Sequence, residues 1–419
     1  MTLDSIGGII KYLYTPWIYV AFLICVVNGP VRRFLKGRRT HFPKYSCVLI
    51  TGCDSGFGLQ MSIKLKRLGY VVVSTCLTER GTTHLSETYG INSIQIDLSK
   101  EGAYDLILNK VQEVLYSNPG ARLWALVNNA GIAPVGFLDW TPVDTFRNAM
   151  EVNYFAPVGV TRAVLQLLKQ YPGSRVINLS SVAGLLAGAN FGPYSGSKHA
   201  LEGFAKALRQ ELRPFDVYVC NVNPGFMATP LIETSLNHAL KAFETAPAEI
   251  KRFYTPDALS GSAQQLLRIQ ESPSVVVDYI VDHLITCKNP DFNNCVGWQA
   301  FLMQGFLLLP YSLQELLMVF SGNPSTTVDH DVLRAYQGEA SVAAAKAADL
   351  NSSIMAATSQ PRKHRPTAPQ PVTTDETPES VPVASAAVHD VNNYENGAHN
   401  TENKRSRGRS QSRAKKQST

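Results

Sequence analysis

Short runs of apolar and β-branched residues alternate with longer amphipathic segments between positions 45 and about 222. Six of these runs predict strands, at 46–50, 70–76, 93–96, 124–128, 174–179 and 217–222. Between them, apolar side chains recur at helical spacing, for example at 59–68, 161–169 and 198–212. Strands that alternate with helices at this spacing form parallel βαβ units. The pattern therefore predicts an α/β fold with a doubly wound parallel sheet.

The pattern is less regular from 230 to 335, where helical spacing is clear only at 232–243 and 275–283. Polar residues and a proline interrupt the apolar stretch 298–320. These interruptions favour a hydrophobic cap over a substrate site, or an element that dips into a membrane surface, over a second transmembrane helix. We expect one folded domain at 45–335, in which residues 230–335 shape the substrate pocket.

Another apolar segment lies near the N-terminus, where residues 12–27 contain no charged side chain and residues 6–10 extend the run. A helix needs about 20 apolar residues to cross a bilayer. The segment lacks the basic start and the small-residue cleavage site of a signal peptide, and a core helix would be an unusual addition before the folded domain. Its aromatic residues are typical of a membrane interface. The sequence therefore predicts a membrane anchor at 1–30.

Basic residues follow the anchor in a linker at 31–44, which contains RRFLKGRR. By the positive-inside rule this flank is cytoplasmic, so the folded domain faces the cytosol. Much of the formal net charge of +6 lies here and in a basic run at 404–416. Residues 340–419 are rich in Ala, Ser, Thr, Pro and Asn, which predicts a disordered tail. A solvated tail is the simplest interpretation; anionic lipid ranks above nucleic acid as its partner, and no nucleic-acid partner is expected.

Composition adds two limits. A chain of 419 residues with 45% hydrophobic residues can bury one large core. The seven cysteines are scattered and no pair has CxxC spacing, which argues against a disulfide framework and against a zinc site. We therefore expect buried cysteines that behave as small apolar residues in a reducing compartment, and no bound metal.

Two glycine-containing motifs predict a dinucleotide site. The sequence TGCDSGFG, at 51–58, lies between a predicted strand and a predicted helix. Gly52, Gly56 and Gly58 allow a tight turn, close approach to a pyrophosphate and close helix packing, and the helix N-terminus offers free N–H groups. The sequence NNAG, at 128–131, ends the fourth strand with small residues that let a cofactor lie against the sheet edge. Together they predict a Rossmann fold.

The third motif carries the chemistry. Tyr194 and Lys198 are four residues apart and share one helix face. A tyrosine pKa of about 10 is too high for a base at neutral pH, and a nearby ammonium lowers it. Ser181, at the end of a predicted strand, can hold the substrate oxygen.

These motifs, with the Asn of MEVNYF, occur in the order and spacing of the short-chain dehydrogenase/reductase family, which the chain resembles over roughly residues 44–230. The strings VLITGCDSGFG, CLTERG, VNNAGI and NLSSVAG resemble the retinol and hydroxysteroid dehydrogenase branch, with D-β-hydroxybutyrate dehydrogenase nearby. The anchor with its basic flank is also similar to microsomal members of that branch. The resemblance implies the endoplasmic reticulum ahead of a mitochondrial membrane, and a homo-oligomer.

The resemblance implies roles residue by residue. Tyr194 would be the acid/base, Lys198 would lower its pKa and hold the nicotinamide ribose, and Ser181 would bind and polarise the substrate oxygen together with Tyr194. Asn153 would keep the helix and a proton-relay water in place. The cofactor would be bound by Gly52, Ser55, Gly56, Phe57, Gly58, Asp97, Asn128, Ala130, Gly131, Tyr194, Lys198, Pro224 and Gly225. Simpler interpretations exist: Asp97 could cap a helix, Asn153 could be a capping or surface residue, and Pro224-Gly225 could be a plain turn.

The cofactor is expected to be NAD, with NADP as the alternative. The end of the second strand has Cys76, Leu77 and Thr78 in place of the acid that usually binds the ribose of NAD. NAD is still expected, because the only nearby cation that could bind the 2′-phosphate of NADP is Arg80, which lies a few residues further on. The expected substrate is a lipophilic alcohol, such as a retinoid or a steroid, and its carbonyl partner. One alternative is an NADPH-dependent reductase of membrane lipid ketones. The other is an inactive membrane-tethered binding or scaffold protein.

Overall fold

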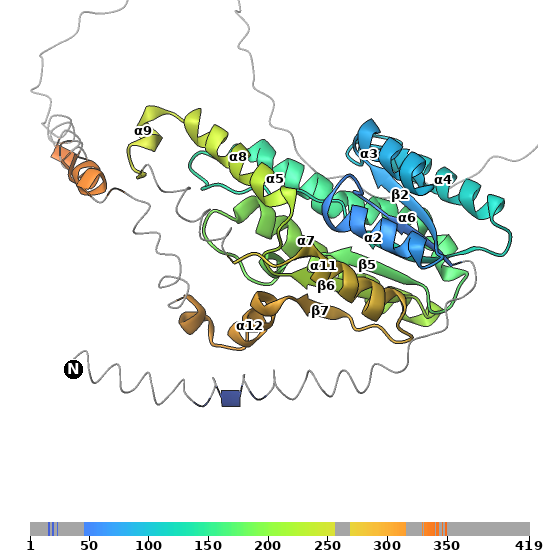
Figure 1. Ribbon diagram of the computed structural model, residues 1–419. Coiled ribbons are helices and arrows are strands. Elements are labelled where there is room, and N and C mark those ends of the chain that lie inside the picture. The colour runs from blue at the N-terminus through green and yellow to red at the C-terminus, as the bar shows by residue number, and fades with distance from the viewer. Residues whose placement is uncertain are drawn as a thin grey trace, which may run out of the picture. The chain divides into compact units, whose positions relative to one another are not determined.

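The computed structural model describes residues 46–255, 269–315, 329 and 331–339, with single positions at 16, 19, 20, 23, 341, 342, 346, 348 and 349. In these residues seven parallel strands form one sheet in the order β3-β2-β1-β4-β5-β6-β7 (Figure 1). The strands are β1 (Ser46–Ile50), β2 (Val71–Cys76), β3 (Asn92–Gln95), β4 (Arg122–Asn128), β5 (Arg175–Leu179), β6 (Tyr218–Pro224) and β7 (Asn293–Val296).

The strand order reverses between β1 and β4. In register, Val48 of β1 lies opposite Val72 of β2, and Leu49 lies opposite Leu126 of β4. The chain runs outward from β1 to β3 and then crosses back to start the other half of the sheet at β4. A switch point of this kind opens a crevice beyond the carboxyl ends of the strands, where ligands of such folds bind.

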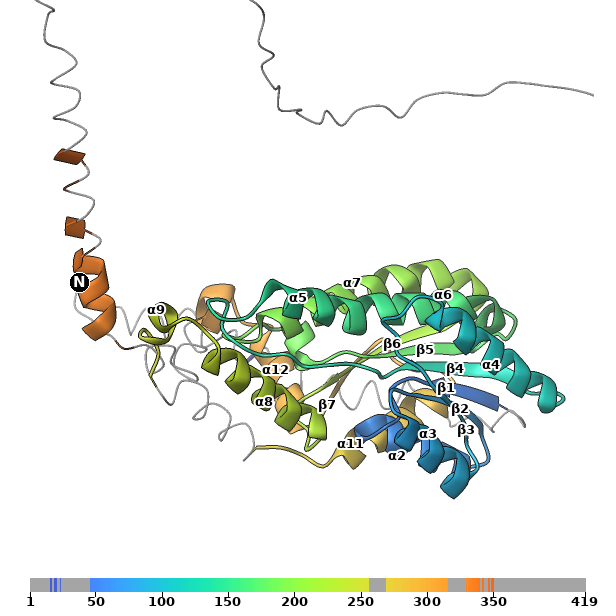
Figure 2. The same ribbon diagram turned by 90° about the horizontal axis from the view of Figure 1, so that it is seen from above.

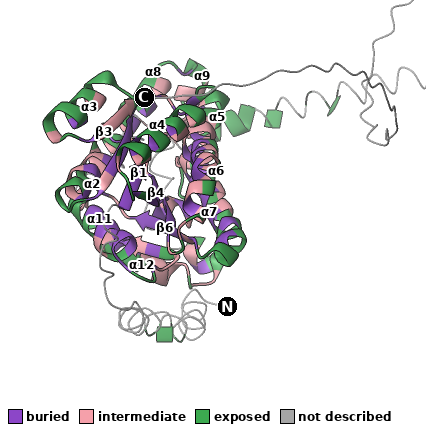
Figure 3. Cartoon of the chain, turned by 90° about the vertical axis from the view of Figure 1, so that its right-hand side faces the viewer, coloured by how far each residue is buried: buried purple, intermediate pink, exposed green. Residues whose placement is uncertain are grey.

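Helices cover both faces of the sheet (Figure 2). One face carries α4 (Ala103–Ser117), α5 (Val143–Met150), α6 (Ala156–Lys169) and α7 (Gly192–Leu212), and the other carries α2 (Gly56–Arg67), α3 (Glu79–Thr83) and α11 (Pro273–Tyr279). Every residue of β1 is buried, as expected for a strand between two helical layers. Figure 3 shows the buried strands enclosed by helices whose outer sides are exposed. The predicted doubly wound α/β fold is therefore confirmed.

All six predicted strands are present within a few residues of their predicted bounds, but β7 was not predicted. Its sequence, NNCV, is short and half polar, so it has no apolar run to mark it. Its pairing with β6 returns the chain to the sheet and places the following helix, α12 (Trp298–Phe306), beyond its end.

The interrupted apolar stretch at 298–320 forms α12, which ends at Phe306, and a further helical stretch at 311–315. Trp298, Phe301 and Leu302 of α12 are about half exposed. In the part of the chain that the structure describes, no helix is both long enough and apolar enough to cross a membrane. The predicted anchor at 1–30 lies almost wholly outside the described residues.

The predicted tail begins differently from expectation. Helical positions occur at 331–339, before the segment predicted to be disordered, and again at 341, 342, 346, 348 and 349, inside it. The sequence there, SVAAAKAAD at 341–349, is rich in alanine, the residue with the highest helix propensity. The rest of the predicted tail lies outside the described residues. The six described cysteines are free and five of them are buried, as predicted.

Candidate active site

The glycine turn after β1 is fixed by close backbone contacts. Gly52 has φ +69°, and a Cβ there would lie 2.6 Å from the Cα of Ala130. A Cβ on Gly58 would lie 2.3 Å from the carbonyl oxygen of Gly52. The side-chain amide of Asn129 donates to the carbonyl oxygens of Thr51 and Gly52, each at 2.8 Å. Only glycine fits at positions 52 and 58, so at these positions the turn at 51–58 exposes backbone atoms with no side chain. This turn is called the glycine cradle below.

The N-terminus of α2 is open for an anion. Its N-cap residue, Ser55, makes no side-chain capping hydrogen bond, and the first turn contains no acidic residue. Gly56, with φ +59°, begins the helix, and Phe57 packs its ring against the core on this face of the sheet. Free N–H groups and the helix dipole favour a phosphate here. The cradle and this helix end together fit the pyrophosphate of a dinucleotide.

Ser181 and Tyr194 come together from two elements. Ser181 follows β5 and caps a short 3₁₀ turn, where its hydroxyl accepts a 3.1 Å hydrogen bond from the N–H of Ala183. Tyr194 lies in the first turn of α7. Burial raises the pKa of the Tyr194 phenol, and a side-chain hydrogen bond with Ser181 lowers it in opposition. The joint role of these two hydroxyls toward a substrate oxygen stays a prediction.

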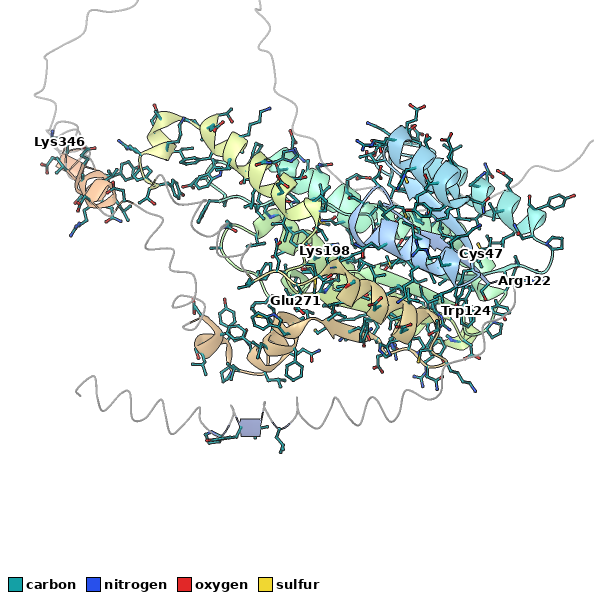
Figure 4. All side chains as sticks on the ribbon, in the orientation of Figure 1. Cys47, Arg122, Trp124, Lys198, Glu271 and Lys346 are labelled. Carbon is teal, nitrogen blue, oxygen red and sulfur yellow. The ribbon has the colours of Figure 1, made fainter. Side chains whose placement is uncertain are left out.

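Lys198 lies inside the fold, on the same helix (Figure 4). Its Nζ donates a 2.7 Å hydrogen bond to the carbonyl oxygen of Leu179 and stands 5.8 Å from the centre of the Tyr194 ring. Burial lowers the pKa of Lys198 to about 8, and the carboxylate of Glu202 opposes this fall. The ammonium is thus bonded to the last carbonyl of β5, and the predicted effect of Lys198 on the pKa of Tyr194 stays a prediction.

Asn153 joins three parts of the site. It lies in a π-helical segment (Glu151–Phe155) between α5 and α6, a distortion that is frequent at functional sites. Its side chain bonds both the N–H and the carbonyl of Ile132, at 2.9 and 2.8 Å. It also donates to the hydroxyl of Ser197, which in turn donates to the carbonyl oxygen of Tyr194. Asn153 thus holds the segment after Gly131 against α7. The proton-relay water that Asn153 is expected to bind stays a prediction.

Three other predicted residues make contacts of their own. The buried amide of Asn128 donates to Thr161 and to Asn178, so that side chain points into the protein. Asp97 accepts from the N–H and the hydroxyl of Ser99, which lowers its pKa and makes it the start of a turn. A Cβ on Gly225, which follows Pro224, would lie 2.5 Å from Oε1 of Gln299. Their roles toward a cofactor stay predictions.

Sequence reasoning missed four polar residues of this region: Asp54, Asn129, Glu202 and Asn223. Asn129 and Asp54 lie inside motifs in which the glycines and small residues carry the sequence signal. Glu202 is four residues after Lys198, so helical spacing alone could have placed its side chain beside the lysine. Asn223 had no local signal, because its partners are distant in sequence.

Comparison with known proteins gives the same class. Residues 46–239 match the family model for short chain dehydrogenases. Retinol dehydrogenase 5 from Mus musculus is 34% identical over 68% of this chain and 91% of its own length. The 17-beta-hydroxysteroid dehydrogenase type 6 from Mus musculus is 32% identical over 74% and 99%. A short-chain dehydrogenase structure from Streptomyces avermitilis, 25% identical, covers 66% of this chain and 96% of its own with a TM-score of 0.52.

A second solved structure, a short chain dehydrogenase/reductase from Burkholderia phymatum in complex with NAD, has the same fold at 22% identity and a TM-score of 0.51, over 68% of this chain and 98% of that one. The chain belongs to the short-chain dehydrogenase/reductase family, in the branch of retinol and hydroxysteroid dehydrogenases, and is an oxidoreductase.

Proposed function

We propose that this protein uses NAD to interconvert a lipophilic alcohol, of the retinoid or steroid kind, and its carbonyl. The observation that carries the proposal is the position of Lys198, one helical turn after Tyr194 on α7. Its Nζ bonds the carbonyl oxygen of Leu179 at the end of β5, close to where Ser181 follows that strand, and would lie 3.5 Å from a Cβ on Gly131. The names of the similar proteins, a retinol dehydrogenase and a 17-beta-hydroxysteroid dehydrogenase, support the substrate class.

Two hydroxyl groups of the site act on the substrate oxygen. Ser181 orients the substrate oxygen by a hydrogen bond, and the Tyr194 hydroxyl exchanges a proton with that same oxygen. A bound nicotinamide supplies the hydride acceptor or donor. Lys198, held by the Leu179 carbonyl, sets the charge beside the phenol, and Asn153 fixes the helix that carries both residues.

The second candidate is an NADPH-dependent reductase of lipid ketones. Arg80 supports it, because this exposed arginine follows β2 and is a cation that a 2′-phosphate could meet. An inactive scaffold has less support, because Gly52, Gly58 and the Tyr194–Lys198 pair are all intact.

We also propose that the protein is held at a membrane, first of all that of the endoplasmic reticulum, with its catalytic domain in the cytosol. The apolar segment at 12–27 and its basic flank support an anchor. The exposed Trp298, Phe301 and Leu302 of α12 support a second contact with lipid. Deleting residues 1–40 should release the protein from the membrane fraction; full retention would assign the attachment to α12 and its neighbours.

The first experiment is cofactor turnover by membranes that carry the protein or its Tyr194→Phe variant. Retinoids, steroids and 3-hydroxybutyrate are offered with NAD or NADP, in both directions. Activity with a lipophilic alcohol and NAD that is lost in the variant is the expected result. Activity only with the phosphorylated cofactor would move the function to the reductase. Absence of activity and of nucleotide binding would leave the scaffold protein as the better description.

A further inference from the structure

The carboxylate of Asp54 lies at the end of β2, although it comes from the glycine turn after β1. Its Oδ2 accepts a 2.7 Å hydrogen bond from the N–H of Leu77, and its Oδ1 accepts a 2.9 Å bond from the N–H of Thr78. The Thr78 hydroxyl donates to the same Oδ1 at 2.6 Å. Asp54 therefore occupies the N–H groups that an anion at this strand end would otherwise use.

The surroundings of Asp54 preserve this arrangement. A Cβ on Gly81 would lie 2.6 Å from Oδ1 of Asp54, so the first turn of α3 leaves room for the carboxylate only because it has glycine there. Leu77 and Thr78 are exposed and Asp54 is partly exposed, so a ligand can reach the carboxylate. The pKa of the Cys76 thiol is raised to about 11, chiefly by burial and in smaller part by the charge of Asp54.

The position of this charge matters for the adenosine ribose. In nucleotide-binding sheets of this kind, the end of the second strand meets the 2′ position of that ribose. A carboxylate has about four lone-pair sites, and three hydrogen bonds occupy three of them. The remaining site can accept a bond from a 2′-hydroxyl. A 2′-phosphate would meet a negative charge and two N–H groups that are already bonded.

We infer that Asp54 is the residue that selects NAD over NADP, in place of the acid that β2 lacks at its own end. Arg80 is the only lysine or arginine between residues 68 and 99, and the exposed Arg80 is the rival determinant for a 2′-phosphate. The inference rests on the proposed nicotinamide-dependent function and names the residue that sets its cofactor preference.

The test measures binding, not turnover. The full-length protein in detergent is titrated with NAD⁺ and with NADP⁺ by calorimetry, and the ratio of the two Kd values is compared among variants. Asp54→Asn should reduce the preference for NAD⁺ by about tenfold, or about 1.4 kcal/mol. This value lies between the repulsions of two unit charges about 4 Å apart in water and near a protein surface, as suits a partly exposed carboxylate. Thr78→Ala keeps the carboxylate but removes its shortest hydrogen bond, so it should leave the ratio unchanged.

Salt gives a second readout that a local unfolding of the turn cannot imitate. Raising the ionic strength to about 0.5 M should narrow the preference of the natural protein, because screening weakens the repulsion, and should leave the ratio of Asp54→Asn unchanged. Equal ratios in Asp54→Asn and the natural protein, or a parallel loss of both nucleotides in Asp54→Asn and Thr78→Ala, would overturn the inference while NAD⁺ binding stood. No binding of either nucleotide, or tighter NADP⁺ binding by the natural protein, would instead overturn the proposed function.

Discussion

The buried carboxylate of Glu202 accepts a 2.6 Å hydrogen bond from the side-chain amide of Asn223, and the same amide nitrogen donates to the carbonyl oxygen of Ser181 at 3.1 Å. The other carboxylate oxygen accepts from Asn221 at 2.8 Å. Glu202 also lies one helical turn after Lys198 and raises its pKa against the effect of burial. One carboxylate thus positions the backbone of Ser181 and supports the charge of Lys198.

Glu202→Gln should lower the turnover rate and change its pH dependence. A glutamine oxygen can accept from one asparagine amide, but its own NH₂ faces the other, which costs about 1–3 kcal/mol of unfolding free energy. Without the carboxylate, the pKa of Lys198 falls below about 8, so the ammonium is lost at a lower pH. The rate should therefore begin to fall at a lower pH, as measured in a pH–rate profile.

Glu211→Gln is the matched control, since Glu211 lies on the same helix and is exposed. It should leave both the stability and the profile as they are. An unchanged profile in Glu202→Gln, at any level of activity, would mean that Glu202 has a purely structural part.

Lys198→Met should abolish activity and change how stability depends on pH. The pKa of Lys198 is about 8 in the folded protein, below its ordinary value of 10.5, so between these values the unfolded chain binds the extra proton. The natural protein therefore gains stability as pH rises through this window. Relative to Lys198→Met, it should gain roughly 1–2 kcal/mol between about pH 7 and 9.5, as measured by urea unfolding.

Lys206→Met provides the comparison, because Lys206 is exposed on the same helix. Its stability difference from the natural protein should not vary over this range. A Lys198→Met difference that is equally flat would show that the buried ammonium keeps an ordinary pKa.

Gly58→Ala should prevent nucleotide binding. The new Cβ would lie 2.3 Å from the carbonyl oxygen of Gly52. Both are attached directly to the backbone, so neither can swing aside as the end of a flexible side chain could. The turn must open, and we expect a loss of about 1–3 kcal/mol in unfolding free energy, the usual cost of overpacking.

Gly203→Ala, at an exposed helical glycine with nothing within 4 Å of the added Cβ, should instead stabilise the protein by about 0.5–1 kcal/mol. Thermal unfolding and calorimetry with NAD⁺ measure both effects; normal binding by Gly58→Ala would refute the cradle.

Arg175→Met should weaken the fold without touching the site. Arg175, at the start of β5, is fully buried and stacks 3.9 Å from the Trp124 ring. Its guanidinium donates to the carbonyl oxygens of Leu284, Ile285 and Cys287, which close a helix on the face opposite α7. Figure 4 places Trp124 away from Lys198, near the end of the sheet where β4 begins.

Loss of these charged hydrogen bonds should cost roughly 2–4 kcal/mol in urea unfolding. The Kd for NAD⁺ below the unfolding transition should stay the same. Arg122→Met, at an exposed arginine that begins β4, is the control and should change stability little. Equal stability of Arg175→Met and Arg122→Met would mean that packing around Trp124 alone holds this end of the sheet.

The sequence by itself determined the local elements. Alternation of apolar runs located six strands, glycine spacing located the cradle, and the four-residue interval between Tyr194 and Lys198 placed both on α7. Each of these depends on neighbours within one or two turns of chain, so a linear pattern records it. The tertiary structure decided what depends on distant partners. Asp54 meets Thr78 across 24 residues, Asn223 meets Glu202 across 21, and Lys198 turns to Leu179 rather than to Tyr194. Sheet topology brings these groups together. Because a buried polar atom without a hydrogen bond is costly in free energy, each one bonds to a partner that the fold places nearby.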